Sequence, residues 1–136
     1  MLTWVPAAHE LGVAEMDATH AEFARLVGAL EDAADADFAA LFDVLAEHTK
    51  RHFANESLLM QACRFPAVAE HESEHRRVLG EVAHIQRAIA AGRLRLARIY
   101  VTKGLPDWFA THLVTMDAAL AACLRRQAKL QQLANG

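Results

Sequence analysis

The sequence predicts an all-α protein: an antiparallel up-down-up-down four-helix bundle with an N-terminal arm. Two observations carry this prediction. The first is composition, since the 136 residues are 54% apolar but only 7% aromatic, with 6 Gly and 3 Pro. Few turn-forming residues beside abundant Ala and Leu favour helices over a sandwich or a barrel. The second is apolar spacing in alternating steps of three and four, which is typical of the buried face of bundle helices.

The first three helices have recognisable ends. The first is expected to follow Asp17, a favoured N-cap residue. The second starts near Asp35 or Asp37. The third begins at Pro66, a residue common in the first helical turn, and stops at Gly92. Short connections between these helices make neighbours antiparallel.

The fourth helical segment is interrupted. Its first part, residues 93–101, fits either a helix or a short alternating strand by pattern, and the surrounding helices favour a helix. Gly104 and Pro106 follow. Because Pro106 cannot donate a backbone hydrogen bond, we expect a kink or a fresh helix start there.

Length and charge exclude several classes of protein. A chain of 136 residues has the size of one domain, which we divide into an arm at 1–16 and a bundle at 17–133. The net charge of −3 argues against a nucleic-acid partner. No apolar run reaches the roughly 18 residues of a membrane span, which argues against membrane insertion. The N-terminus lacks a basic region before an apolar stretch, so we expect a cytoplasmic protein.

The main chemical signal is a set of histidines on the apolar faces of all four predicted helices, accompanied by one glutamate. These residues are His20, His52, Glu56, His71, His75 and His112. One buried histidine is ordinary, but five on converging faces are not. A buried carboxylate also needs a cation, so the set indicates a metal site. Spacings of four within His52–Glu56 and His71–His75 direct each pair to one side of its helix.

Asp117 is a seventh candidate ligand with a geometric difficulty. It follows His112 by five residues, which an ideal helix places about 140° apart. A π-bulge would turn both side chains inward. A regular helix would instead leave Asp117 facing sideways and put Met116 on the buried face. Spacing alone favours the regular helix, because Met116 lies four residues after His112.

The number and type of ligands favour two metal ions. Seven donors exceed the four of a tetrahedral zinc ion, and imidazole with carboxylate suits iron or manganese. Residues 71–75, HESEH, match the H-E-x-x-H pattern of zinc proteases, but the third ligand is missing. Glu72 with His75 and Glu81 with His84 match the Glu-x-x-His pairs of ferritin-like proteins, but both pairs lie on one predicted helix.

Four stretches of the sequence carry more specific motifs: WVPAAHELGVAEMDATH, HTKRHFANESLLM, FPAVAEHESEH and WFATHLVTMD. With them the chain resembles the bacterial hemerythrins over nearly its whole length. It departs from the family at Ser57, where a second glutamate is common, and at His48, where a tyrosine is common.

The resemblance implies two iron ions per chain joined by an oxo or hydroxo bridge. It places His71, His75 and His112 on one iron ion, His20 and His52 on the other, and Glu56 and Asp117 between them as bridges. It therefore also favours the π-bulge before Asp117.

The resemblance further implies reversible dioxygen binding at the two-histidine iron ion, for oxygen storage, delivery or sensing. We expect a binding protein and not an enzyme, because histidine-rich ligation supports high-valent iron less well than carboxylates do. The alternatives are a di-iron oxidase or peroxidase, and an iron or oxygen sensor that acts through a protein partner. The apolar walls expected around dioxygen are Phe23, Phe53, Leu59, Trp108 and Leu113.

Overall fold

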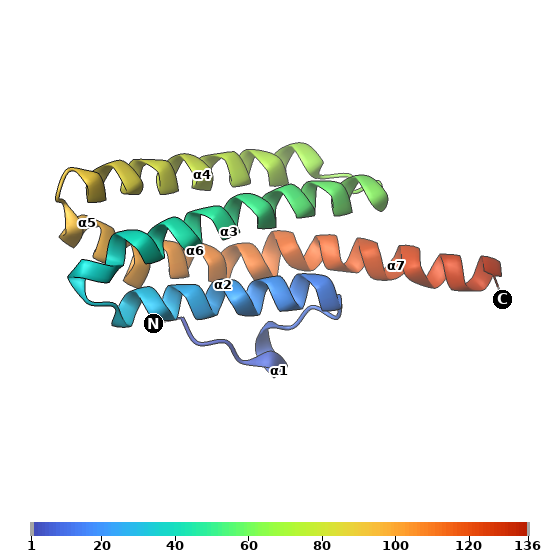
Figure 1. The fold of residues 1–136 in the computed structure, drawn as a ribbon. Coiled ribbons are helices and arrows are strands. Elements are labelled where there is room, and N and C mark those ends of the chain that lie inside the picture. Colours follow the sequence, from blue (N-terminus) through green and yellow to red (C-terminus); the bar gives the residue numbers. More distant parts are fainter. Residues whose placement is uncertain (1, 136) are drawn as a thin grey trace.

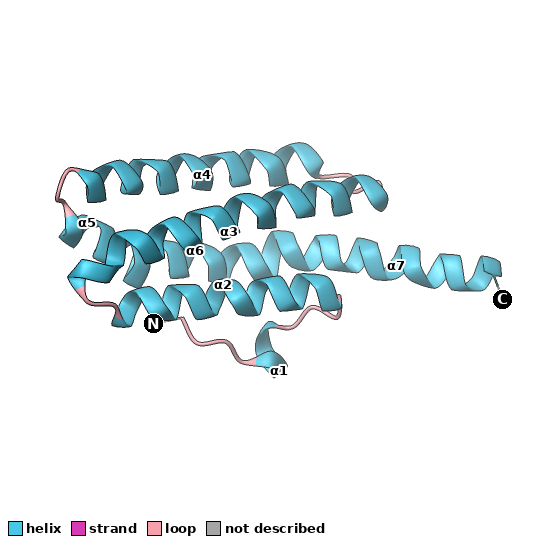
Figure 2. Ribbon diagram, in the orientation of Figure 1, coloured by secondary structure: helices cyan, strands magenta, loops and turns pink. Residues whose placement is uncertain are grey.

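A computed structural model describes residues 2–135, and every regular element in that range is a helix (Figure 2). Three long helices and a fourth helical segment, which is built from several shorter pieces, run antiparallel beside one another (Figure 1). The three helices are α2 (Ala14–Asp32), α3 (Asp35–Ala62) and α4 (Val68–Ala90). The predicted up-down-up-down bundle is therefore confirmed. None of the helices in this described range is both long and apolar enough to cross a membrane.

The fourth helical segment of the bundle is a continuous rod that contains two π turns. Its parts are α5 (Leu94–Ile99), η1 (Tyr100–Gly104), α6 (Leu105–His112), η2 (Leu113–Asp117) and α7 (Ala118–Asn135). The helical alternative for residues 93–101 is thus correct. The expected interruption is a π turn that ends at Gly104, and Pro106 follows in the first turn of α6, where its missing N–H is tolerated.

The N-terminal arm packs on the bundle. It contains the short helix α1 (Pro6–His9), and Leu2 and Trp4 contact the apolar core. Figure 1 shows the arm passing along the outside of α2 before the chain turns into that helix.

The start of α2 differs from the sequence prediction. Asp17 is not the N-cap, because the helix begins at Ala14 and Asp17 lies inside its first turn. The Asp17 carboxylate accepts hydrogen bonds from the backbone N–H groups of Leu11, at 2.7 Å, and Gly12, at 3.2 Å. It therefore holds the turn before the helix, where Gly12 adopts a φ of 82°.

The start of α4 also differs from the prediction. The helix begins at Val68, and Pro66 lies in the turn that precedes it. That turn includes Arg64, which adopts a φ of 54°, and the backbone N–H of Phe65 donates to the carbonyl of Met60 at 2.9 Å. The turn is thus held by the end of α3. Pro66 belongs to this turn and does not start α4.

The interior of the bundle has three layers along its axis. A large apolar layer fills the end that holds α5 and includes Phe38, Phe42, Leu45, Val82 and Leu105. A smaller apolar layer near the other end contains Met16, Met60, Phe65, Leu120 and Ala121, with Cys63 and Cys123 half-buried against it. Between the two layers, α2, α3, α4 and the rod each contribute buried histidines or carboxylates. The fold therefore encloses a polar layer within an apolar core.

We expect opposite effects from alanine at two glycines. Gly92 ends α4 with a φ of 82°, whereas Gly28 lies inside α2. A Cβ at either position meets no other atom of the described chain within 4 Å, so only backbone conformation distinguishes them. Gly92→Ala should destabilise the protein by about 1 kcal/mol and Gly28→Ala should stabilise it by a similar amount. Urea unfolding measures both, and equal changes would contradict this interpretation of Gly92.

Candidate metal centre

The structure brings together all seven residues that the sequence proposes as ligands. They form two groups within which the potential donor atoms lie within 4.8 Å of one another. One group is Glu56, His71, His75, His112 and Asp117, and the other is His20, His52 and Glu56. None of the seven residues is more than 5% exposed. Since α2, α3, α4 and the rod all contribute, the cluster exists only in the assembled bundle.

Asp117 contacts both groups of histidines. Its Oδ1 lies 3.1 Å from Nε2 of His71 and 3.1 Å from Nε2 of His112. Its Oδ2 lies 3.1 Å from Nε2 of His20. One oxygen of this carboxylate therefore faces the three-histidine side and the other faces the two-histidine side.

Glu56 has the same divided arrangement. Its Oε2 lies 2.8 Å from Nε2 of His52 and 3.4 Å from Nε2 of His20. Its Oε1 lies 3.3 Å from Nε2 of His71 and 3.2 Å from Nε2 of His75. Both carboxylates thus stand between a pair and a trio of imidazoles, which is the position that bridging ligands of two metal ions require.

A π turn brings Asp117 into the cluster. The turn η2 begins directly after His112 and ends at Asp117, and it inserts the extra residue that a five-residue spacing needs. Asp117 is fully buried as a result, whereas Met116 is only half-buried. The π-bulge that the family resemblance favours is therefore confirmed, and the regular helix that the spacing alone favours is wrong.

The donor set fits a metal ion. Several buried polar atoms find no hydrogen-bond partner among the described residues: Nε2 of His20, Nε2 of His71, Oε1 of Glu56 and both carboxylate oxygens of Asp117. Each unpaired buried polar group costs about 1–3 kcal/mol. Cations between these atoms would provide the missing partners, and a mixed imidazole and carboxylate set suits iron or manganese.

Without metal, protons hold the cluster together. Burial lowers the pKa of His20 and of His71, but the carboxylates of Asp117 and Glu56 outweigh it and raise both pKa values to about 9. Burial and the charge of Glu56 act to raise the pKa of Asp117, but the nearby imidazoles of His112, His20 and His71 hold it below its ordinary value. The carboxylates are therefore ionised, and the imidazoles of His20 and His71 carry protons at neutral pH.

Aromatic rings surround the cluster, including three of the five wall residues proposed from the sequence. Phe53 stacks on His75 with ring centroids 3.8 Å apart and planes 1° apart. Trp108 stacks on His112 at 4.6 Å, and Phe23 meets the edge of His52 at 6.3 Å. Of the other two, Leu113 is buried in the same large apolar layer as Phe23 and Phe53, and half-buried Leu59 packs against the small layer.

Two further aromatic residues lie near His20 that the sequence did not identify as walls of the site. The Phe109 ring lies 5.5 Å from the His20 ring and 4.8 Å from Phe23, and it is buried. Its spacing, three residues before His112, is a signal that could have identified it. The Trp4 ring of the N-terminal arm lies 6.4 Å from His20. No local pattern could place Trp4, because the arm belongs to no long helix.

The remaining histidines lie outside both groups. His84 is exposed, and His9 and His48 are half-buried. His48 lines a surface hollow of about 220 Å³ that also reaches His52. Between α3 and α4, a second hollow of about 290 Å³ reaches His75 past Phe53 and Ser57. The cluster is thus close to the surface at two points although its own atoms are buried.

A buried layer of imidazoles and carboxylates shared by four antiparallel helices defines a metal-binding bundle protein. Comparison with known families then identifies which kind: the model of the hemerythrin HHE cation binding domain matches residues 11–124. The chain belongs to this family.

Two relatives align with almost the whole chain. It is 39% identical over 127 residues to a bacteriohemerythrin of Ralstonia nicotianae, an alignment that covers 93% of this chain and 91% of the relative. It is 26% identical over 128 residues to a bacteriohemerythrin of Methylococcus capsulatus, with 91% and 97% covered.

Solved structures show the same fold. A crystal structure of wild-type hemerythrin superposes with a TM-score of 0.79 at 24% identity and covers 91% of this chain and 98% of that one. A point mutant of hemerythrin gives a TM-score of 0.80 at 24% identity, with 91% and 97% covered.

We expect the metal-free protein to lose stability as pH rises from 6.5 to about 9. The pKa values of His20 and His71 are raised from 6.5 to about 9, so the stability they contribute is complete below pH 6.5 and disappears as pH rises through about 9. Urea unfolding at the two pH values measures the loss. Asp117→Asn removes one of the charges that raise both pKa values and should flatten the dependence. Equal unfolding free energies for the unaltered protein would contradict this account.

Proposed function

We propose that this protein is a di-iron protein that binds dioxygen reversibly. One observation carries the proposal: each of two buried carboxylates contacts the two-histidine side with one oxygen and the three-histidine side with the other. His71, His75 and His112 would hold one iron ion, and His20 and His52 the other. Glu56 and Asp117 would bridge them, together with an oxo or hydroxo group.

The unequal division of the histidines supports ligand binding on one side. The side with two imidazoles has one protein donor fewer than the side with three, and an open position is where an external ligand binds at a metal ion. When bound, the iron pair supplies the electrons and the open position that reversible dioxygen binding needs. His20 and His52 would therefore mark the dioxygen side.

Apolar rings from three parts of the chain cover this two-histidine side. Phe23 lies against His52, Phe109 against His20, and Trp4 of the arm lies 6.4 Å from His20. Such a wall limits the entry of water, which favours a stable bound ligand over its hydrolytic loss. These side chains therefore suit carriage better than turnover. We propose a role in oxygen storage, delivery or sensing.

A spectroscopic experiment tests this function. Protein prepared without oxygen and loaded with ferrous iron is expected to develop a visible absorption band under dioxygen. The band should disappear under vacuum and return over repeated cycles. Rapid decay that depends on an added electron donor, with formation of an oxidised product, would instead identify an oxidase or a peroxidase.

Metal analysis tests the ligand set. We expect two iron ions per chain, because seven donors exceed what one ion accepts. Asp117→Ala should lower the iron content and abolish the stable oxygenated band, because a bridging carboxylate is lost. His48→Ala is the matched control, since His48 belongs to neither group, and it should keep both iron ions. One zinc ion per chain in iron-replete protein, or an unchanged band in Asp117→Ala, would contradict the assignment.

A further inference from the structure

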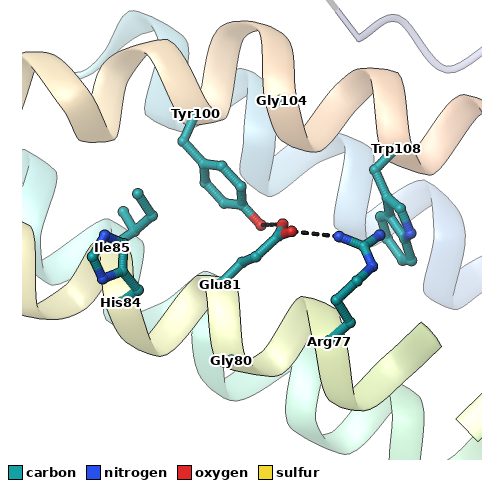
Figure 3. A pocket seen from close by; sticks show the side chains of 8 residues that line it. All are labelled: Arg77, Gly80, Glu81, His84, Ile85, Tyr100, Gly104 and Trp108. Carbon is teal, nitrogen blue, oxygen red and sulfur yellow. Dashed lines mark hydrogen bonds and ion pairs between the residues drawn. The ribbon is translucent and has the colours of Figure 1, made fainter. Parts of the chain in front are cut away.

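A groove of about 590 Å³ lies outside the metal centre, between α4 and the η1–α6 part of the rod (Figure 3). Its volume falls within the range of small-molecule sites. Figure 3 shows Tyr100 and Trp108 reaching from the rod toward Glu81 and Arg77 of α4. The remaining lining residues are Gly80, His84, Ile85 and Gly104. None of the lining residues belongs to the seven proposed ligands.

Two glycines keep the groove open. Gly80 on α4 is exposed, and a Cβ built there meets no other atom of the described chain within 4 Å. Gly104 on the rod is also exposed, but a Cβ there would lie 3.1 Å from Cδ1 of Tyr100. The absence of side chains at these positions therefore leaves space on one wall and seats the Tyr100 ring on the other.

The fixed charges in the groove already satisfy one another. The Arg77 guanidinium pairs with Glu81 and donates to Oε1 of Glu74 at 2.9 Å. The Tyr100 hydroxyl donates to Oε1 of Glu81 at 3.3 Å. A charged ligand would find no unpaired partner among these groups. The Glu81 carboxylate nevertheless keeps spare acceptor capacity, because two oxygens can accept about four hydrogen bonds.

The walls are suited to a flat ring. Tyr100 and Trp108 are two turns apart on the rod, with Gly104 between them, and Ile85 adds an apolar surface from α4. The Trp108 ring is held from behind, since it stacks on His112 and its Nε1–H donates to Glu74 at 2.6 Å. Aromatic faces that are fixed in this way prefer planar partners in stacked or edge contact.

We propose that this groove is a second ligand site, for an uncharged, planar aromatic molecule with an N–H or O–H donor on its edge. The ring packs against Tyr100 and Trp108, and the donor reaches the Glu81 carboxylate. Indoles and phenols have this chemistry. Because Trp108 also stacks on His112, the occupant lies one ring away from the metal centre. None of the lining side chains is a proposed metal ligand, so the site stands independently of the proposed dioxygen function.

Fluorine NMR of 5-fluoroindole with the purified protein tests the site. Wild-type protein is expected to broaden the fluorine signal at sub-millimolar to millimolar ligand concentrations. Gly80→Leu places a side chain in the groove and should weaken binding by about tenfold or more, which corresponds to the loss of a few good contacts. Gly28→Leu is the matched control: it also replaces an open helical glycine, but on α2, and should bind as wild type does.

A methylated ligand tests the hydrogen bond. 5-Fluoro-1-methylindole lacks the N–H donor and should bind several-fold more weakly to wild type. Equal binding of the two ligands would overturn the role of Glu81.

An absence of binding to wild type, or equal weakening by Gly80→Leu and Gly28→Leu, would overturn the site. Gly104→Ala provides a second variant, because its Cβ displaces the Tyr100 ring, and undiminished binding there would overturn Tyr100 as a wall.

Discussion

The contact between two buried carboxylates and five imidazoles is the constraint on which the rest of this bundle depends. Glu56 and Asp117 are almost fully buried, and a buried carboxylate is strongly unfavourable without a cationic or proton-donating partner. The imidazoles that surround them come from α2, α3, α4 and the rod, so each of these elements must present its histidines at the same level along the bundle axis. The apolar layers on either side then have their positions along the helices set by this polar layer. The cluster therefore determines the register of the helices as well as the chemistry.

The two π turns of the rod show how a regular helix is adapted to function. A π turn gives up regular hydrogen bonding to re-aim the residues around it, and such turns favour functional sites. The turn η2 places Asp117 on the same side as His112, without which only Glu56 could join the two histidine groups. The turn η1 runs from Tyr100 to Gly104, and the Tyr100 ring lies close to Gly104 and forms a wall of the outer groove. Both departures from the α-helix therefore occur where a ligand is proposed to bind.

The aromatic shell links the metal centre to the rest of the molecule. Phe23 and Phe109 contact the two-histidine side, and the N-terminal arm adds Trp4. On the three-histidine side, Phe53 stacks on His75 and Trp108 stacks on His112. Rings on both sides restrict the motion of the imidazoles and exclude water, which is what a reversible binding site needs. Trp108 also reaches the outer groove, so one indole touches both sites.

The sequence by itself determined the helices, the three- and four-residue spacing and the level at which the histidines lie, because these are local properties of a helix. Together with the resemblance to bacterial hemerythrins it predicted the π-bulge before Asp117. It misplaced the starts of two helices: the Asp17 carboxylate holds the turn before α2 through Leu11, and Pro66 lies in a turn that a hydrogen bond from Phe65 to Met60 ties to the end of α3. Only the tertiary structure decided which carboxylate oxygen faces which histidine, that Phe109 and Trp4 cover His20, and that two glycines open a groove. These features depend on how the helices are rotated and packed against one another, which residue spacing along one helix does not encode.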